Sequence, residues 1–205
     1  MPGPFGNPLG SSSANPVLGG LPLGATPKTS SATAPYVVTY GDNSGYSTTR
    51  NQTWTCPKTG TYRFAQWGQG GFGNGSAPYG GGAAHAQTVR KIGKDETVTI
   101  AANSTSGTRG AKITLTFPDG TVVETLGGQN SSSGGAGGTA TGGDINVSGS
   151  VGSGAGGNAG SYGNFTGGIG AGDGVTPQYG VTPGGGATAS SYEPGSAFVI
   201  IIREA

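Results

Sequence analysis

Short runs in which apolar and polar residues alternate predict β-strands through the middle of the chain. In residues 112–117, Ile113, Leu115 and Phe117 alternate with lysine and threonine, the pattern of a strand with one buried face. Other runs rich in Val, Ile, Thr and Tyr are bounded by turn residues and predict strands at 36–40, 61–67, 86–92, 96–101 and 122–126. The sequence therefore predicts an all-β fold, with an antiparallel β-sandwich or jelly-roll-like body over residues 36–126.

Two further signals define how this body is connected. Pro118, Asp119 and Gly120 form a turn sequence that joins two of the predicted strands in a hairpin. Near the end of the chain, Phe198 begins a run of large apolar residues that is too short for a membrane span. Such a run suits a strand buried on both faces. We expect residues 196–205 to be the closing strand of the body.

A glycine-rich insertion separates the body from this closing strand and occupies residues 127–195. More than half of the 46 glycines of the chain lie in residues 127–186. Gly154, Gly157 and Gly160 recur at every third residue, which is the period of the polyproline-II conformation. We expect polyglycine-II-like rods that pack sideways at positions lacking a Cβ; strand-like stacking against neighbours and disorder are the alternatives.

The first 35 residues differ from both regions. Proline, glycine and serine interrupt any helical or strand period, yet large apolar residues are scattered among them and Lys28 is the only charge. Disordered tails are usually charged and poor in apolar residues. We expect an extended N-terminal arm that settles into grooves on neighbouring subunits, rather than a flexible leader. Its predicted anchors are Phe5, Leu9, Leu18, Leu21 and Leu23.

Composition and charge exclude several classes of protein. Of the 205 residues, 46 are glycine and only 9 % are charged, which disfavours helical bundles, and the strict collagen repeat is missing. Ten Lys and Arg residues against nine Asp and Glu residues leave a net charge of +1, so we expect no nucleic-acid partner. No apolar run is long enough for membrane insertion and no signal peptide is recognisable, which predicts synthesis in the cytoplasm.

Candidate catalytic chemistry is sparse. His85 is the only histidine and is expected at the surface or at a sheet edge, while the single cysteine, Cys56, is expected to be a buried small side chain. The spacing Gly68-x-Gly70-x-x-Gly73 matches a dinucleotide fingerprint, but no helix can follow it. We therefore predict no enzyme, no catalytic residues, no cofactor and no metal site.

Several segments resemble the glycine-rich domain of bacteriophage tail-fibre and tail-tip proteins. Those proteins combine an aromatic residue, a Pro-x-x-Gly turn, a strand and a glycine-rich loop, and residues 54–73 have the same order. Residues 140–149 and the closing strand at 197–203 are also similar, although the glycine triplets of this chain are interrupted more often. The resemblance covers about residues 50–205 and implies a β-sandwich with a glycine-rich insertion, used in virions for assembly or host attachment.

The expected function follows from this resemblance, the apolar arm and the lack of catalytic residues. We expect a virion structural protein of a tail fibre, tail tip or capsid appendage, assembled as a homo-oligomer with other virion proteins through its arm and glycine-rich layer. The alternative is a receptor-binding adhesin that contacts a host-surface glycan or protein through loops of the insertion. Tyr162, Phe165 and Tyr179 are its candidate contacts, either with a receptor or with a neighbouring subunit. A glycine-rich ice-binding protein is a third and more distant reading.

Overall fold

The computed structural model describes residues 36–40, 50–73, 79–103, 109–130, 134–153, 155–168, 170, 180, 183–187 and 194–204. Within these residues the chain forms ten strands and no helix, so no helix among them could cross a membrane. The predicted arm anchors Phe5, Leu9, Leu18, Leu21 and Leu23 lie outside the described residues, as does Tyr179.

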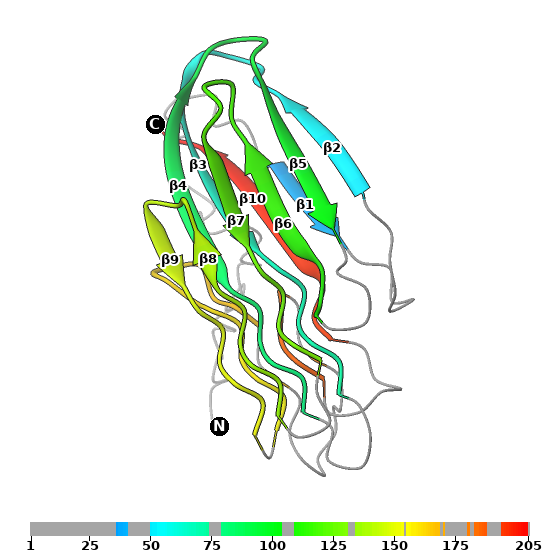
Figure 1. Ribbon diagram of the computed structural model, residues 1–205. Helices are drawn as coiled ribbons and strands as arrows, with labels where there is room; N and C mark the ends of the chain where they lie inside the picture. The colour runs from blue at the N-terminus through cyan, green and yellow to red at the C-terminus, as the bar shows by residue number, and fades with distance from the viewer. Residues whose placement is uncertain are drawn as a thin grey trace, which may run out of the picture. The chain divides into compact units, whose positions relative to one another are not determined.

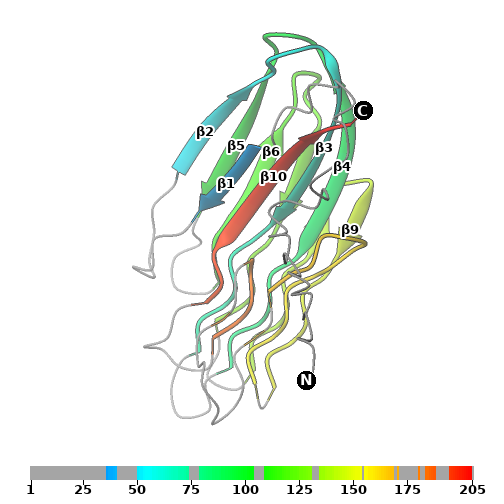
Figure 2. The same cartoon turned by 180° about the vertical axis from the view of Figure 1, so that it is seen from behind.

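Two antiparallel five-stranded sheets make up the body, in the arrangement of a β-sandwich (Figures 1 and 2). One sheet has the order β1-β10-β3-β4-β9, with strands β1 (Tyr36–Tyr40), β10 (Ala197–Arg203), β3 (Gly60–Trp67), β4 (His85–Ile92) and β9 (Ile145–Val147). The other has the order β2-β5-β6-β7-β8, with strands β2 (Arg50–Thr55), β5 (Thr97–Asn103), β6 (Lys112–Thr116), β7 (Val122–Thr125) and β8 (Ala140–Thr141).

The core between the sheets is built by the predicted alternation. Strands β5, β6 and β7 send every second side chain inward, as Ile113 and Leu115 do from β6, and both are fully buried. Aromatic side chains from different strands meet edge to face, with Phe64 and Phe117 ring centroids 4.9 Å apart. Cys56 is buried beside this core, as predicted. Large apolar side chains thus fill the space between the two sheets.

Most predicted strands are confirmed, with bounds that shift by one or two residues. The hairpin of β6 and β7 turns at Pro118 and Asp119, and Gly120 has the positive φ of 81° that favours glycine there. The closing strand β10 lies inside its sheet between β1 and β3. Ala197, Val199 and Ile201 are fully buried on one face, while Phe198 and Ile200 on the other face are partly buried against the cluster of Trp67, so the expected burial on both faces is confirmed only in part.

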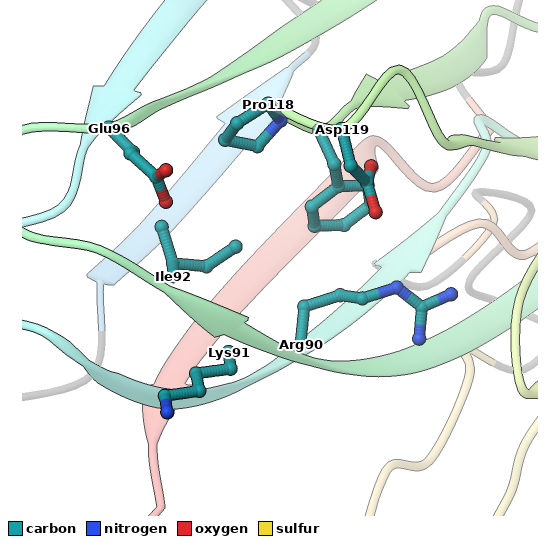
Figure 3. Close-up of a pocket in the computed structure, with 7 residues that line it drawn as sticks. Arg90, Lys91, Ile92, Glu96, Pro118 and Asp119 are labelled. Carbon is teal, nitrogen blue, oxygen red and sulfur yellow. The ribbon is translucent and has the colours of Figure 1, made fainter.

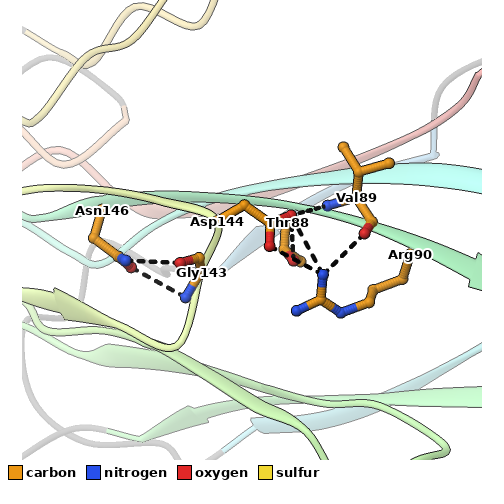
Figure 4. A network of polar contacts seen from close by, with 6 residues as sticks. All are labelled: Thr88, Val89, Arg90, Gly143, Asp144 and Asn146. Carbon is orange, nitrogen blue, oxygen red and sulfur yellow. Dashed lines mark hydrogen bonds and ion pairs between the residues drawn. The ribbon is translucent and has the colours of Figure 1, made fainter.

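The short connection between β8 and β9 joins the two sheets along one edge, because β8 pairs with β7 and β9 pairs with β4. Asp144 lies in the turn and fastens it to β4 (Figure 4). Its carboxylate accepts hydrogen bonds from the Val89 amide at 2.7 Å, the Thr88 hydroxyl at 3.0 Å and the Arg90 guanidinium at 3.1 Å. Partial burial raises the pKa of Asp144, but these hydrogen bonds outweigh it and hold the pKa below its usual value.

Below the sandwich, extended segments continue from the ends of the strands and run alongside one another (Figure 1). We call this assembly the glycine bundle. Its segments are residues 68–73, 79–84, 109–111, 126–130, 134–139, 148–153, 155–160, 166–168, 183–187 and 194–196. Segment 68–73 follows β3 directly and segment 79–84 leads directly into β4, so the bundle and the sandwich share continuous backbone.

Candidate functional site

Segment 79–84 lies at the centre of the glycine bundle, because its backbone is hydrogen-bonded to six other segments. Its amide groups donate to three of them. Gly80 and Ala83 donate to segment 183–187, Gly81 and Ala84 to segment 126–130, and Gly82 to Ser150 of segment 148–153, at 2.8–3.1 Å. The same partner therefore recurs at every third residue of the central segment.

The carbonyl groups of the central segment accept hydrogen bonds from the remaining three neighbours. Tyr79 and Gly82 accept from segment 134–139, Gly80 and Ala83 from segment 155–160, and Gly81 and Ala84 from segment 68–73, at 2.7–3.3 Å. The three-residue period is the same as for the donors. Paired backbone groups, rather than apolar side chains, hold the middle of the bundle together.

Glycine is required in the bundle because the segments approach too closely for a side chain. A Cβ at Gly82 would overlap the carbonyl oxygen of Asn158, and one at Gly81 would overlap that of Ala136. The same holds for Gly128 and Gly186, in segments well separated along the chain. These obstacles are backbone atoms, which cannot move aside as a flexible side chain can.

The bundle recruits residues that the sequence analysis placed in the sandwich body. The bundle contains three segments from within the predicted body, 68–73, 79–84 and 109–111. These segments pair with others from the predicted insertion. The three-residue spacing of Gly157 and Gly160 matches this pairing, since their amides donate to the carbonyl groups of Gly80 and Ala83, three residues apart in the central segment.

A second, smaller cluster of buried side chains marks the junction of the bundle and the sandwich. The rings of Trp67 and His85 stack with centroids 4.3 Å apart, and the Trp67 indole donates to the carbonyl oxygen of Gly160 at 2.9 Å. His85 is completely buried on an interior strand, so the expected surface or edge position is wrong. Its neighbours on either side, β3 and β9, and the bundle segment 155–160 exclude water from it.

Burial lowers the pKa of His85 to about 4, and a hydrogen bond to a backbone carbonyl opposes this only in part. The ring is therefore neutral at neutral pH. Its Nδ1 lies 3.0 Å from the carbonyl oxygen of Gln66, which can only accept, so Nδ1 carries the proton. Nε2 then accepts from the side-chain amide of Gln87, 3.0 Å away.

Tyr162 and Phe165, two of the predicted contact residues, are brought together by a tight turn. Each donates its amide to the other's carbonyl oxygen, at 3.0 and 3.1 Å, and Gly163 between them has a φ of 57°. Glycine at the first central position with positive φ is typical of a two-residue hairpin turn. Phe165 packs toward Trp67, whereas Tyr162 remains 50 % exposed.

The turn forms one wall of a pocket of about 580 Å³, which we call the Tyr162 pocket. The opposite wall comes from three strands of one sheet: Arg63 of β3, Gln87 of β4 and Ile202 of β10. Tyr162, Gly163, Asn164 and Phe165 complete the lining. Sequence reasoning found the aromatic residues of the turn but missed the wall, because its residues come from distant parts of the chain.

Polar groups in this pocket are held in fixed positions. The Arg63 guanidinium donates to the Glu204 carboxylate at 2.6 Å and to the Gln87 side-chain oxygen at 3.3 Å. The Gln87 amide nitrogen in turn donates to the carbonyl oxygen of Tyr162 at 3.2 Å. This chain of contacts connects the strand wall of the pocket to the turn.

A smaller pocket of about 230 Å³ lies at the far end of the sandwich, beside the β6–β7 turn (Figure 3). Ile92 and Phe117 supply its apolar surface, and the Arg90 guanidinium lies 5.8 Å from the centre of the Phe117 ring. Lys91, Glu96, Pro118 and Asp119 complete the lining. Hydrogen bonds from Thr121 hold the pKa of the Asp119 carboxyl below its usual value. This pocket differs from the Tyr162 pocket because it is lined by charged residues of both signs and has no exposed aromatic ring.

No cluster of three or more His, Cys, Asp or Glu side chains that could hold a metal ion occurs in the part of the chain that the structure describes. Asp144, which lies in the turn between β8 and β9, is already engaged by Arg90 and β4. No family model and no curated protein matches this chain.

Proposed function

We propose that this chain is a structural component of a bacteriophage virion, in a tail fibre, a tail tip or a capsid appendage. The observation that carries the proposal is the central segment 79–84, whose backbone bonds to six neighbouring segments with a three-residue period. We interpret the bundle as polyglycine-II-like, since a three-residue repeat and lateral backbone hydrogen bonds are the features of that packing. The sandwich would be its jelly-roll-like base.

Such a bundle suits a load-bearing part of a particle. Because β3, β4, β7, β9 and β10 run directly into bundle segments, the two regions cannot rotate independently about a linker. Close backbone packing also makes the bundle rigid without a large apolar core. Rigidity and a low content of charge both fit a protein that is built into an assembly.

Residues 1–35 provide the proposed means of assembly. Their apolar residues would occupy grooves on other subunits of a homo-oligomer or on other virion proteins. Deletion of residues 1–30 should leave a folded body that no longer enters particles. Normal incorporation of the truncated protein into particles would refute this part of the proposal.

The experiment that tests the function is localisation in the intact particle. Cryo-electron microscopy of virions, with antibody labelling of the chain, should place it in the tail or in a capsid appendage. Purified virions that lack the chain altogether would overturn the proposal.

A second candidate function, the receptor-binding adhesin, is favoured by one specific observation. Tyr162 is half exposed on a turn held by the bundle, beside a concave pocket with several polar side chains. Exposed aromatic residues on a rigid support are typical of binding surfaces. The purified protein should then block adsorption of the phage to its host, whereas a purely structural component should not.

A further inference from the structure

We propose that the Tyr162 pocket binds one unit of a neutral saccharide, stacked on the Tyr162 ring. The inference rests on the second function proposed above, since it takes the ligand to be part of a host-surface glycan. The proposed sugar site lies at the junction of the bundle and the sandwich. It uses side chains of β3, β4 and β10, which the adhesin function itself does not require.

The platform for stacking is preorganised. Below the turn, the Phe165 ring lies 6.3 Å from that of Trp67 and 6.4 Å from that of His85. From the side, Gln87 donates to the carbonyl oxygen of Tyr162. A ligand that stacks on Tyr162 therefore orders little of the protein on binding, which preserves affinity.

The lining of the pocket matches the two faces of a sugar ring. The exposed Tyr162 ring and Ile202 offer apolar surface to the C–H groups of a pyranose. The side-chain amides of Gln87 and Asn164 and the Arg63 guanidinium offer donors and acceptors to its hydroxyl groups. A few fixed polar groups within an otherwise apolar lining are the usual features of a small-molecule site.

Charge selects a neutral sugar over an acidic one. Arg63 is the only charged residue that lines the pocket, and its guanidinium is paired with Glu204 at 2.6 Å. A carboxylate on the ligand would have to compete with Glu204 for Arg63 and would be repelled by it. The pair leaves the pocket without net charge, and its remaining polar groups are uncharged amides and a phenol.

The smaller pocket beside the β6–β7 turn does not meet these requirements. It is lined by two cationic and two anionic residues, Arg90, Lys91, Glu96 and Asp119. Its ring, Phe117, is buried and is covered by the Arg90 guanidinium. No aromatic face is left there for stacking.

Binding can be tested by NMR titration of the full-length, ¹⁵N-labelled protein with galactose, glucose, N-acetylglucosamine and, for comparison, glucuronate. At least one neutral sugar should shift the Gly163 and Asn164 amide signals and the Gln87 side-chain signals at millimolar concentration. The absence of such shifts with all three neutral sugars, or tighter binding of glucuronate, would overturn the proposal.

Variants then assign the binding to the pocket. Tyr162→Ala should weaken the binding about tenfold or more, while Tyr162→Phe, which keeps the ring, should weaken it much less. Val151→Ala removes another exposed apolar side chain of the bundle, 61 % exposed, and should leave the affinity unchanged. Equal affinity of wild type and Tyr162→Ala, with unchanged thermal stability, would contradict the stacking role.

Adsorption assays separate this inference from the function on which it rests. If sugar binds at Tyr162 but the purified protein does not block phage adsorption, the pocket stands and the adhesin function fails. If wild type and Tyr162→Ala block adsorption equally, the adhesin function stands and the pocket is not its site. A synthetic peptide of residues 1–31 that displaces the sugar would instead assign the pocket to the arm and overturn the proposal.

Discussion

The sandwich and the glycine bundle are ordered by opposite means, although they share continuous backbone. In the sandwich, large side chains such as Phe64, Ile100 and Leu115 are buried between two sheets. In the bundle, positions such as Gly81, Gly82 and Gly128 leave no room for a Cβ, and backbone amides and carbonyl groups of neighbouring segments meet directly. The sandwich depends on the atoms beyond Cβ, and the bundle depends on the absence of Cβ at these glycine positions.

This contrast shows that the two regions respond differently to the same kind of substitution. Removing side-chain atoms should damage the sandwich and leave the outer surface of the bundle unaffected. Adding a single methyl group should damage the bundle and leave the turns of the sandwich unaffected.

The largest effect is expected for Gly82→Ala at the centre of the bundle. The new Cβ would overlap the carbonyl oxygen of Asn158, and the surrounding segments would have to separate and lose hydrogen bonds. We expect a loss of at least about 4 kcal/mol in the free energy of unfolding, measured by urea denaturation. Gly93→Ala, which meets only the flexible Glu96 side chain, is the matched control and should be close to wild type. Similar stabilities of the two variants would refute the role assigned to close packing.

In the sandwich, Leu115→Ala should cost about 3 kcal/mol, because it leaves a cavity in a fully buried core. Val151→Ala makes a comparable truncation on the outside of the bundle and should change stability by less than about 0.5 kcal/mol. Thermal and urea unfolding of both variants check the difference. A large effect of the Val151 change would mean that the bundle also depends on its side chains.

At the junction of the two regions, acid should weaken the fold through His85. The unfolded histidine takes up a proton near pH 6.5, whereas the buried ring does so only near pH 4. Between these values the unfolded state binds more protons, so stability should fall as the pH is lowered from 7 to 4, by about 3 kcal/mol in total. The comparison of wild type with His85→Gln between pH 7 and 5, where carboxylates stay ionised, isolates this contribution. Parallel stability curves for the two proteins would contradict it.

Among the changes expected to destabilise the fold, Asp144→Asn in the β8–β9 turn should have the smallest effect. The amide keeps the shape of the carboxylate but weakens its hydrogen bonds to Val89, Thr88 and Arg90. Because Asp144 is about half exposed, we expect a loss of about 1 kcal/mol. The loss should disappear below the pH at which the wild-type carboxylate is itself protonated. A loss that persists there would point to a packing effect.

The sandwich could be predicted from the sequence more completely than the glycine bundle. Alternation located most strands, since a half-buried strand shows its period in its own residues. It missed β2, where Trp54 is the only large apolar residue, and the very short β8 and β9. Glycine carries no such pattern, so membership of the bundle could be guessed from triplet spacing but not limited to the correct segments.

The Tyr162 pocket and the junction were less predictable for a different reason. His85 is a single polar residue in a run of small ones, and its burial depends on Trp67 of the neighbouring strand and on the turn at Phe165. The pocket needs Arg63, Gln87 and Ile202 to be adjacent, which only the strand order of the sheet brings about.

The six-neighbour arrangement of segment 79–84 also has a consequence for biosynthesis. Its partners extend from residue 68 to residue 187, and β10, which closes one sheet, lies beyond them. The central segment therefore cannot complete its contacts until the ribosome has made nearly the whole chain, and such long-range pairing folds slowly. Before these contacts form, the glycine segments expose few apolar groups to other nascent chains. Their late pairing therefore carries a lower risk of aggregation than the late pairing of hydrophobic strands would.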